Sequence, residues 1–404
     1  DPHMDVEDIG DAVTMGRRLR RIRLARRKTQ QVVADRAAIS KGYLSMLERG
    51  ERTLDSLKLI VALARALEIA PSELTGLPVP APGNGHTDSA TERVRHALTA
   101  VDVGHPGGLV VPVDVLRDRA ARLQDARRRC RFAEVADDLP GLIRDLHTSI
   151  NAGGHDVAEL FPLAAFVHAD IVSKWLQDAG APELRWQAAT VARNAAAEHG
   201  ETTTLGVAAF GTAWALVSGG MLDLAQAELD SATFPPTTPE TAGLVCALTM
   251  MHAVVAAADN RPGDVAAPME SAAELAQRFG QPGEDSPLGF AVGPADVGFR
   301  GIALALDAGE PDRAVAIAEG VRPEQLSFVT RQAGYWVDFG RAAARLRDRR
   351  DDAVRAFLAV EELFPVRVYR NPLARETIAG LVQRSRSDAV GRDLRGLASR
   401  AGLL

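Results

Sequence analysis

The sequence has few of the residues on which several classes of protein depend. Only two cysteines, Cys130 and Cys246, occur in 404 residues. They are too few for a disulfide framework or a four-cysteine metal site, and they favour a reduced, cytoplasmic setting. No uninterrupted run of about 18 apolar residues is present, so we expect no membrane span. No charged and then apolar leader opens the chain, so we expect no secretion.

The motifs of common catalytic sites are also missing. The nine histidines are scattered, and neither His-Glu-x-x-His nor Cys-x-x-Cys occurs. Residues 104–109 are glycine-rich, but no Lys-Ser or Lys-Thr follows as in a phosphate-binding loop, and no Gly-x-Ser-x-Gly elbow occurs. We therefore expect no enzyme, no cofactor and no metal; a metal found by elemental analysis would revive catalysis as an alternative.

The charge that is present is unevenly distributed along the chain. The net charge is −6, but residues 15–52 hold twelve Lys or Arg and three Asp or Glu, a net of +9. Residues 1–14 carry a net of −5, and residues 53–404 carry a net of −10. A compact cationic segment on an acidic chain favours contact with a polyanion, because each neutralised phosphate releases counterions. A solvated helix face is the simpler alternative for a charge run alone.

The apolar spacing of residues 15–75 predicts a series of short helices. A hydrophobic content of 46% and a length of 404 residues predict a globular chain of two or three domains. The expected helices are a first with Leu19, Ile22 and Ala25 on one face, a second over Gln30–Ala37 capped by Thr29, a third from Ser40 to Arg49 ended by Gly50, a fourth over Leu57–Leu67, and a short turn opened by Pro71.

The rest of the chain contains helical patterns and no alternating strand pattern. Four aspartates, each expected to open a helix, are 41, 48 and 40 residues apart: Asp223, Asp264, Asp312 and Asp352. This loose period predicts an α-solenoid of helical hairpins, with a generic helical bundle as the alternative. The expected domains are a tag scar before Met4 and an acidic tail (1–14), a basic helical domain (15–77), a linker with one possible helix (78–111), and a helical-repeat domain (112–404).

Three stretches of the basic domain resemble the phage-repressor (Xre-like) helix-turn-helix family. They are Gly16–Arg23, Thr29–Ala34 and Ile39–Gly50. The resemblance implies a lambda-repressor-like fold that binds double-stranded DNA, with the helix from Ser40 to Arg49 in the major groove. It also implies an Arg23–Glu48 pair that ties the first helix to the third. Ala38 departs from the family, which often has glycine in this turn.

The expected DNA contacts follow from this resemblance and from helical spacing. Leu44 and Leu47 should face the core, and the opposite side of the same helix should face DNA. Gly42 presents no side chain, so some specificity is expected from DNA shape. The expected contacts are Gln30, Ser40, Lys41, Gly42, Tyr43, Ser45, Met46, Arg49 and Arg52.

The helical-repeat region is weakly similar to tetratricopeptide repeats. Together with the DNA-binding domain it resembles peptide-sensing and pathway-type bacterial regulators, which implies an all-α protein that senses a small molecule or peptide and forms a homodimer on a palindromic operator. The alternative is a DNA-targeted scaffold or antagonist that recruits a partner protein. Candidate ligand contacts, for each of which core packing is the simpler explanation, are Trp214, His252, Arg300, Tyr335 and Trp336.

Overall fold

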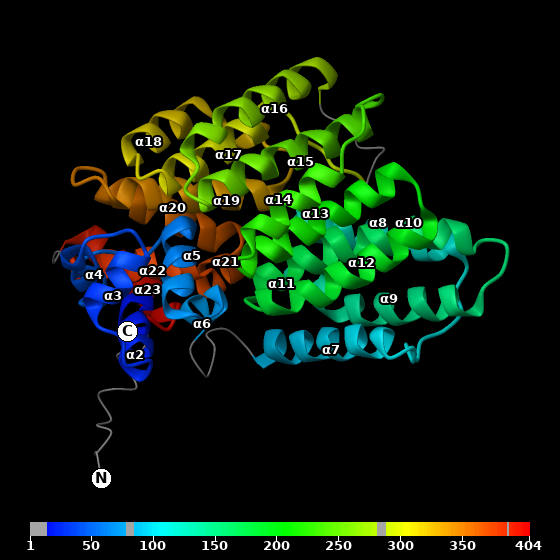
Figure 1. Cartoon of the computed structure of the whole chain (residues 1–404), viewed down its shortest axis with the longest axis horizontal. Helices are drawn as coiled ribbons and strands as arrows, with labels where there is room; N and C mark the ends of the chain where they lie inside the picture. Colours follow the sequence, from blue (N-terminus) through cyan, green and yellow to red (C-terminus); the bar gives the residue numbers. More distant parts are fainter. Residues whose placement is uncertain (1–13, 78–84, 281–287, 386–387) are drawn as a thin grey trace, which may run out of the picture. The chain divides into compact units, whose positions relative to one another are not determined.

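The computed structural model describes residues 14–77, 85–280, 288–385 and 388–404, and every regular element in these ranges is a helix (Figure 1). The all-α prediction is therefore confirmed. The expected tag scar and most of the acidic tail, at residues 1–13, and the start of the expected linker, at 78–84, lie outside the described residues.

The helices have the following bounds in chain order. They are α2 (Met15–Ala25), α3 (Gln30–Arg36), α4 (Lys41–Glu48), α5 (Leu57–Leu67), α6 (Pro71–Thr75), α7 (Gly85–Asp102), α8 (Val113–Arg128), α9 (Phe132–Ala152), α10 (Val157–Phe166), the π-helix η2 (Val167–Val172), α11 (Ser173–Ala179), the 3₁₀ turn η3 (Pro182–Leu184), α12 (Arg185–His199), α13 (Thr202–Ser218), α14 (Leu222–Ser231), α15 (Pro239–Ala258), η4 (Pro262–Asp264), α16 (Ala266–Phe279), α17 (Pro294–Asp307), α18 (Pro311–Gly320), η5 (Pro323–Gln325), α19 (Val329–Ala344), α20 (Arg350–Leu363), α21 (Pro365–Arg370), α22 (Pro372–Gln383) and α23 (Ala389–Arg400).

Contacts between residues divide the chain into two units. Unit 1 contains Asp1–Gly83, Ala305–Ala316 and Ala333–Leu404, and unit 2 contains Asn84–Leu304 and Ile317–Gln332. Unit 1 thus combines the N-terminal helices with the last helices of the chain. This grouping differs from the expected boundaries, which place residues 112–404 in one domain, because sequence order does not show which distant segments pack together.

The head of unit 1, residues 14–77, is built around one apolar core. Leu19 on α2, Val33 on α3, Leu44 and Leu47 on α4 and Leu63 on α5 are fully buried in this core. Leu44 and Leu47 therefore face inward, as their spacing predicted. Burying such side chains stabilises the fold by about 1.5–3 kcal/mol each.

The helix ends of the head have the capping residues predicted from the sequence. The Thr29 hydroxyl accepts a hydrogen bond from the Val32 amide at 3.3 Å, and the Ser40 hydroxyl accepts one from the Tyr43 amide at 3.1 Å. Gly50, just beyond α4, has a φ of 73°, which a glycine adopts without strain. These contacts satisfy backbone groups that a helix end otherwise leaves unpaired.

The C-terminal helices of unit 1 form a second core, and the head is bonded to them. Phe357 and Leu394 are fully buried in that core. The Met15 amide, at the start of α2, donates to Glu376 Oε2 on α22 at 2.9 Å. Arg345 donates to both carboxylate oxygens of Asp55 at 2.5 and 3.1 Å. The head therefore belongs structurally to the same unit as the end of the chain.

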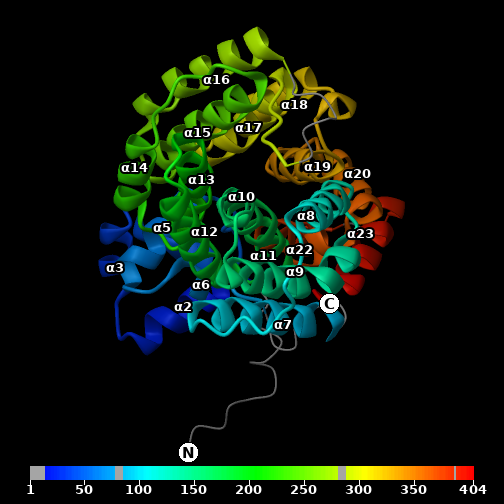
Figure 2. The same ribbon diagram turned by 90° about the vertical axis from the view of Figure 1, so that its right-hand side faces the viewer.

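Unit 2 is an array of helices in which neighbours along the chain pack together. Helix α12 packs on α13, α13 on α14, and α15 on α16 (Figure 2). Asp223 lies in the first turn of α14 and Asp264 in η4, just before α16, as predicted. The array is compatible with the expected solenoid of helical hairpins.

Helix α15 qualifies the expectation that no segment could span a membrane. Its 20 residues are long and apolar enough to cross a bilayer by length and composition, with a mean hydropathy of 1.8 over 18 residues. Thr249 and His252 lie among its apolar residues, so the sequence contains no uninterrupted apolar run there. Since 72% of the apolar window is buried inside the fold, α15 has the environment of a core helix.

Candidate nucleic-acid interface

Helices α3 and α4 are joined by a tight turn that sets the direction of the second helix. The chain leaves α3 through Ala37 and turns at Ala38, which has a φ of 54°. The Ile39 amide then donates to the Ala34 carbonyl at 3.0 Å, and Ser40 caps α4. Ala38 therefore has the left-handed conformation that is strained for an alanine, at the position where the resembled family often has glycine.

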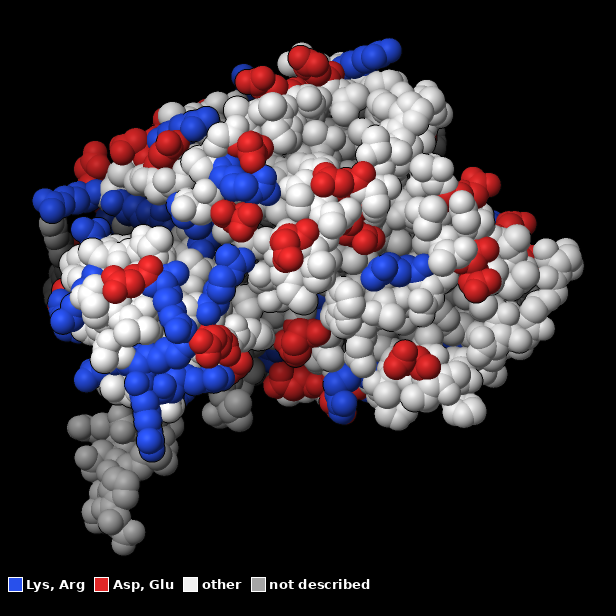
Figure 3. Space-filling view, viewed as in Figure 1, with Lys and Arg blue, Asp and Glu red and all other residues white. Residues whose placement is uncertain are grey.

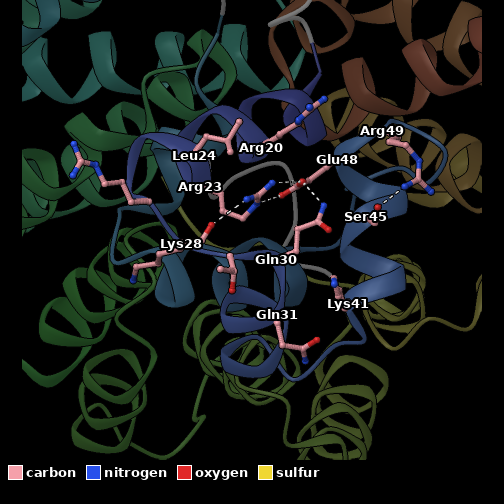
Figure 4. Close-up of a pocket in the computed structure, with 12 residues that line it drawn as sticks. Arg20, Arg23, Leu24, Lys28, Gln30, Gln31, Lys41, Ser45, Glu48 and Arg49 are labelled. Atoms are coloured by element: carbon pink, nitrogen blue, oxygen red, sulfur yellow. Dashed lines mark hydrogen bonds and ion pairs between the residues drawn. The ribbon is translucent and has the colours of Figure 1, made fainter.

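A buried ion pair fixes the first helix of the head to α4. Arg23 on α2 donates through two nitrogens to the Glu48 carboxylate at 2.6 and 2.8 Å, and both side chains are buried. The bond to Glu48 raises the pKa of Arg23. Gln30 at the start of α3 also donates to Glu48, at 2.8 Å, so Glu48 lies between Arg23 and Gln30 (Figure 4). One carboxylate thus orients three helices at once.

A polar groove of about 680 Å³ lies over this network. Its walls come from α2, the segment that leads into α3, the first turn of α3, and α4 (Figure 4). The lining residues are Arg20, Arg23, Leu24, Arg27, Lys28, Thr29, Gln30, Gln31, Lys41, Ser45, Glu48 and Arg49. Eight of these side chains are basic or carry an amide, so the groove is suited to an anionic, hydrogen-bonding partner.

The outer side of α4 is open where the predicted base contacts lie. Lys41 and Gly42, in the first turn, are exposed, and a methyl group placed on Gly42 would meet nothing within 4 Å. Ser45 is half-buried. Met46 is also half-buried, so its side chain is less exposed than that of Lys41. The N-terminal turn of α4 is therefore the most accessible part of the helix.

Arg49, the last predicted contact on this side of α4, already has partners. It donates to both carboxylate oxygens of Glu51 at 2.6 and 3.0 Å and also bonds the Ser45 hydroxyl. Its side chain is 52% exposed, so the pair is weak and screened by salt. A phosphate or a guanine edge could therefore replace Glu51 as the partner of Arg49 at little cost.

The predicted phosphate contacts have different surroundings. Ser40 and Arg52 are exposed. Tyr43 is half-buried against the core of the head, where burial and the nearby Asp55 carboxylate raise its pKa. The side-chain amide of Gln30 donates one hydrogen bond to Glu48, and its second N–H remains able to donate to another acceptor.

Several basic residues that the sequence analysis did not single out also lie on the head. In the view of Figure 3, Lys and Arg side chains gather over the head helices of Figure 1. Exposed members that line the groove are Arg20 and Arg27, and Gln31 adds a polar group. The net charge of residues 15–52 pointed to this surface, but the residues that reach the groove depend on helix packing.

Two of the candidate ligand contacts are in contact with each other in unit 2. The guanidinium carbon of Arg300 lies 5.4 Å from the centroid of the Trp214 ring. Arg185 lies near the same ring, at 5.5 Å. His252 belongs to a different group, in which its Nδ1 lies 2.9 Å from Gln226 Nε2.

The remaining two candidates belong to unit 1. Tyr335 is buried, and its ring packs edge-on against Trp336 at 5.0 Å. The Phe339 ring stacks on Tyr335 at 6.2 Å. The five candidates are therefore distributed over the two units. Among the described residues, no group of three or more His, Cys, Asp or Glu side chains is placed to hold a metal ion.

The arrangement of α2–α4 defines the class of this domain. Two short helices joined by a tight turn, a third helix bonded to them, and a basic groove constitute a DNA-binding helix-turn-helix. Residues 14–76 also match the model of a family described as a helix-turn-helix domain. Comparisons with curated proteins and with solved structures gave no significant match. The chain therefore carries a helix-turn-helix DNA-binding domain.

Proposed function

We propose that this protein is a cytoplasmic, sequence-specific transcriptional regulator of the Xre type, without catalytic activity of its own. The observation that carries the proposal is the exposed first turn of α4 beside a basic groove, on a helix held in place by the Arg23–Glu48 pair. In helix-turn-helix proteins this part of the second helix reaches base edges, while neighbouring basic groups hold phosphates.

The proposal includes a homodimer on a palindromic operator. One head offers only α4 to the major groove, which is too small a contact for tight, specific binding. Two heads related by a two-fold axis would contact half-sites one helical turn apart. The tetratricopeptide-like helical array would provide the sensing and dimerising part, where an effector favours one arrangement of the two heads.

The first test of the proposal is an electrophoretic shift assay with the full-length protein on operator DNA. We expect affinity to fall steeply with salt, because phosphate contacts release counterions. Lys41→Ala should weaken binding by about 1–3 kcal/mol if Lys41 reads a base. Arg355→Ala is the matched control, since Arg355 lies on α20 and is 69% exposed. Unchanged affinity in the double variant Lys41→Ala, Arg49→Ala would contradict the assignment of α4.

A second measurement separates sensing from scaffolding. Native mass spectrometry of the full-length protein would show a bound small molecule or peptide if the array is a sensor. A stoichiometric partner protein in place of such a ligand would instead favour the recruiting scaffold. The same spectra report whether the protein is a dimer, which the operator model requires.

A further inference from the structure

Three cationic side chains from different helices approach one short segment of unit 2. Arg128, at the end of α8, donates to the Gly289 carbonyl at 2.7 Å. Arg331, near the start of α19, donates to the Ala291 carbonyl at 2.6 Å. Lys174 on α11 lies 5.9 Å from the centroid of the ring between these two residues. Arg331 lies more than 150 positions beyond Arg128 and Lys174 in the chain, and the fold brings all three into one cationic cluster.

The same three cations lie against aromatic rings. The Phe328 ring is 4.1 Å from the guanidinium carbon of Arg128 and 4.7 Å from that of Arg331. The ammonium nitrogen of Lys174 is 5.6 Å from the centroid of the Phe210 ring. Cations on aromatic faces are attracted by the ring quadrupole. The cluster therefore presents positive charge and apolar surface side by side.

The carboxylates in the cluster balance only part of its positive charge. Asp170 pairs with Lys174 and lies 3.4 Å from Arg127. Asp296 lies 2.9 Å from Arg331. With Arg128, the group contains four cations and two carboxylates. This excess is notable in a chain whose residues 53–404 carry a net charge of −10.

Arg128 is the cation of this cluster that lacks a close ion pair among the described residues, although the Asp170 and Asp125 carboxylates act on it at longer range. It makes no ion pair among the described residues, and its buried Nε has no hydrogen-bond partner there. Burial lowers the pKa of Arg128 to about 10. An unpaired buried donor on a charged group is costly, and a bound anion would remove this cost.

The cluster is accessible and lies beside an irregular element. The Lys174 side chain is 32% exposed and that of Arg331 is 22% exposed, so solvent reaches both. Burial nevertheless lowers the pKa of Lys174 to about 8. Asp170 lies within the π-helix η2, a rare geometry that is frequent at functional sites.

We propose that Arg128, Lys174 and Arg331 form a binding site for a small organic anion that carries an apolar ring or chain. The guanidinium groups would bind the acidic group, for which their planar fork is suited. The rings of Phe210 and Phe328 would contact the apolar part. This inference gives a ligand class to the proposed sensing role; binding itself does not depend on the DNA function.

The test uses the full-length protein and two fluorescent probes with the same ring system. These are 8-anilinonaphthalene-1-sulfonate, an anion, and N-phenyl-1-naphthylamine, which is neutral. We expect saturable binding of the anion at one site and at least tenfold weaker binding of the neutral probe. Arg128→Met should weaken anion binding at least tenfold, while Arg128→Lys should give an intermediate affinity, because the charge is retained but the planar fork is lost. Arg129→Met is the matched control, because this neighbour is 67% exposed.

The outcomes separate this site from the DNA-binding proposal. Equal binding of the anion by wild-type protein and Arg128→Met, or equal binding of the two probes, would overturn the inference. Should Arg128→Met fail to fold, Lys174→Gln provides the same comparison with the same expected loss. Operator affinity is measured on the same samples without probe. Probe binding without operator binding would reject the proposed function and leave the anion site standing, and the reverse result would reject only the site.

Discussion

Two head helices each have a glycine as their second residue, and we expect its replacement by alanine to have opposite effects in the two helices. Gly16 is the second residue of α2 after the cap Thr14, and Gly42 is the second residue of α4 after the cap Ser40. A Cβ on Gly16 would lie 2.0 Å from the Leu47 carbonyl oxygen, whereas a Cβ on Gly42 would meet nothing within 4 Å. The change in helix propensity from glycine to alanine is therefore the same at both positions, and only the packing around the new Cβ differs.

The magnitudes follow from that difference. Real Cβ contacts below 3.0 Å essentially do not occur, so Gly16→Ala would push α2 away from α4 by ~1 Å or more. Such overpacking costs about 1–3 kcal/mol, and it acts on the contact that orients α4. Gly42→Ala should instead stabilise the head by up to about 1 kcal/mol, because alanine loses less backbone entropy than glycine in a helix.

Hydrogen exchange of the full-length protein, read by mass spectrometry, measures both effects locally. A loss of about 2 kcal/mol would speed exchange in peptides from α2 and α4 roughly thirtyfold, while peptides from α12 and α13 stay unchanged. Operator affinity should fall in Gly16→Ala along with the protection of α4. Equal protection of α4 in Gly16→Ala and the wild-type protein would refute the close α2–α4 contact on which the site is built.

Two further predictions concern strain and ionisation in unit 1. Ala38→Gly should raise the free energy of unfolding of the head by about 0.5–1 kcal/mol in denaturant titration, because it relieves the left-handed alanine; a loss would contradict this. Burial raises the pKa of Glu376 to about 7 from 4.5, so stability should fall as pH rises from 4.5 to 7. Glu376→Gln should abolish this fall and stabilise unit 1 at pH 8 by up to about 3 kcal/mol, measured by thermal unfolding at pH 5 and 8; an unchanged pH profile would exclude Glu376 as its source.

The local structure of the head could be predicted from sequence because it depends on neighbours along the chain. The caps at Thr29 and Ser40 and the glycine after α4 each follow from one or two adjacent residues. The inward direction of Leu44 and Leu47 follows from helical spacing alone. In each case the physical cause acts within about one helical turn.

The contacts between distant segments could not be predicted in this way. Gly16 is part of the recognised motif. The physical cause that requires a glycine there is the close Leu47 carbonyl, which lies 31 residues away in the chain. Arg128 and Arg331 appear in sequence as two unrelated cations, and only folding brings them to the same Phe328 ring. The spacing of apolar residues along one sequence does not indicate which distant residues come into contact. The candidate ligand residues could therefore be chosen only by residue type.

The bonds between the head and the last helices give the DNA-binding helix a physical connection to the rest of unit 1. Asp55 follows α4 by a short loop, and its carboxylate is held by Arg345 while Arg341 donates to its carbonyl. Asp55 is buried, so breaking these bonds would leave a buried charge unpaired, at a cost of about 3–5 kcal/mol. Any change in the C-terminal helices that moves Arg345 must therefore either carry the Asp55 loop with it or release the head. The loop that follows α4 is thus bonded directly to Arg341 on α19 and to Arg345 just beyond it, which couples the head to the C-terminal helices of unit 1 at that point.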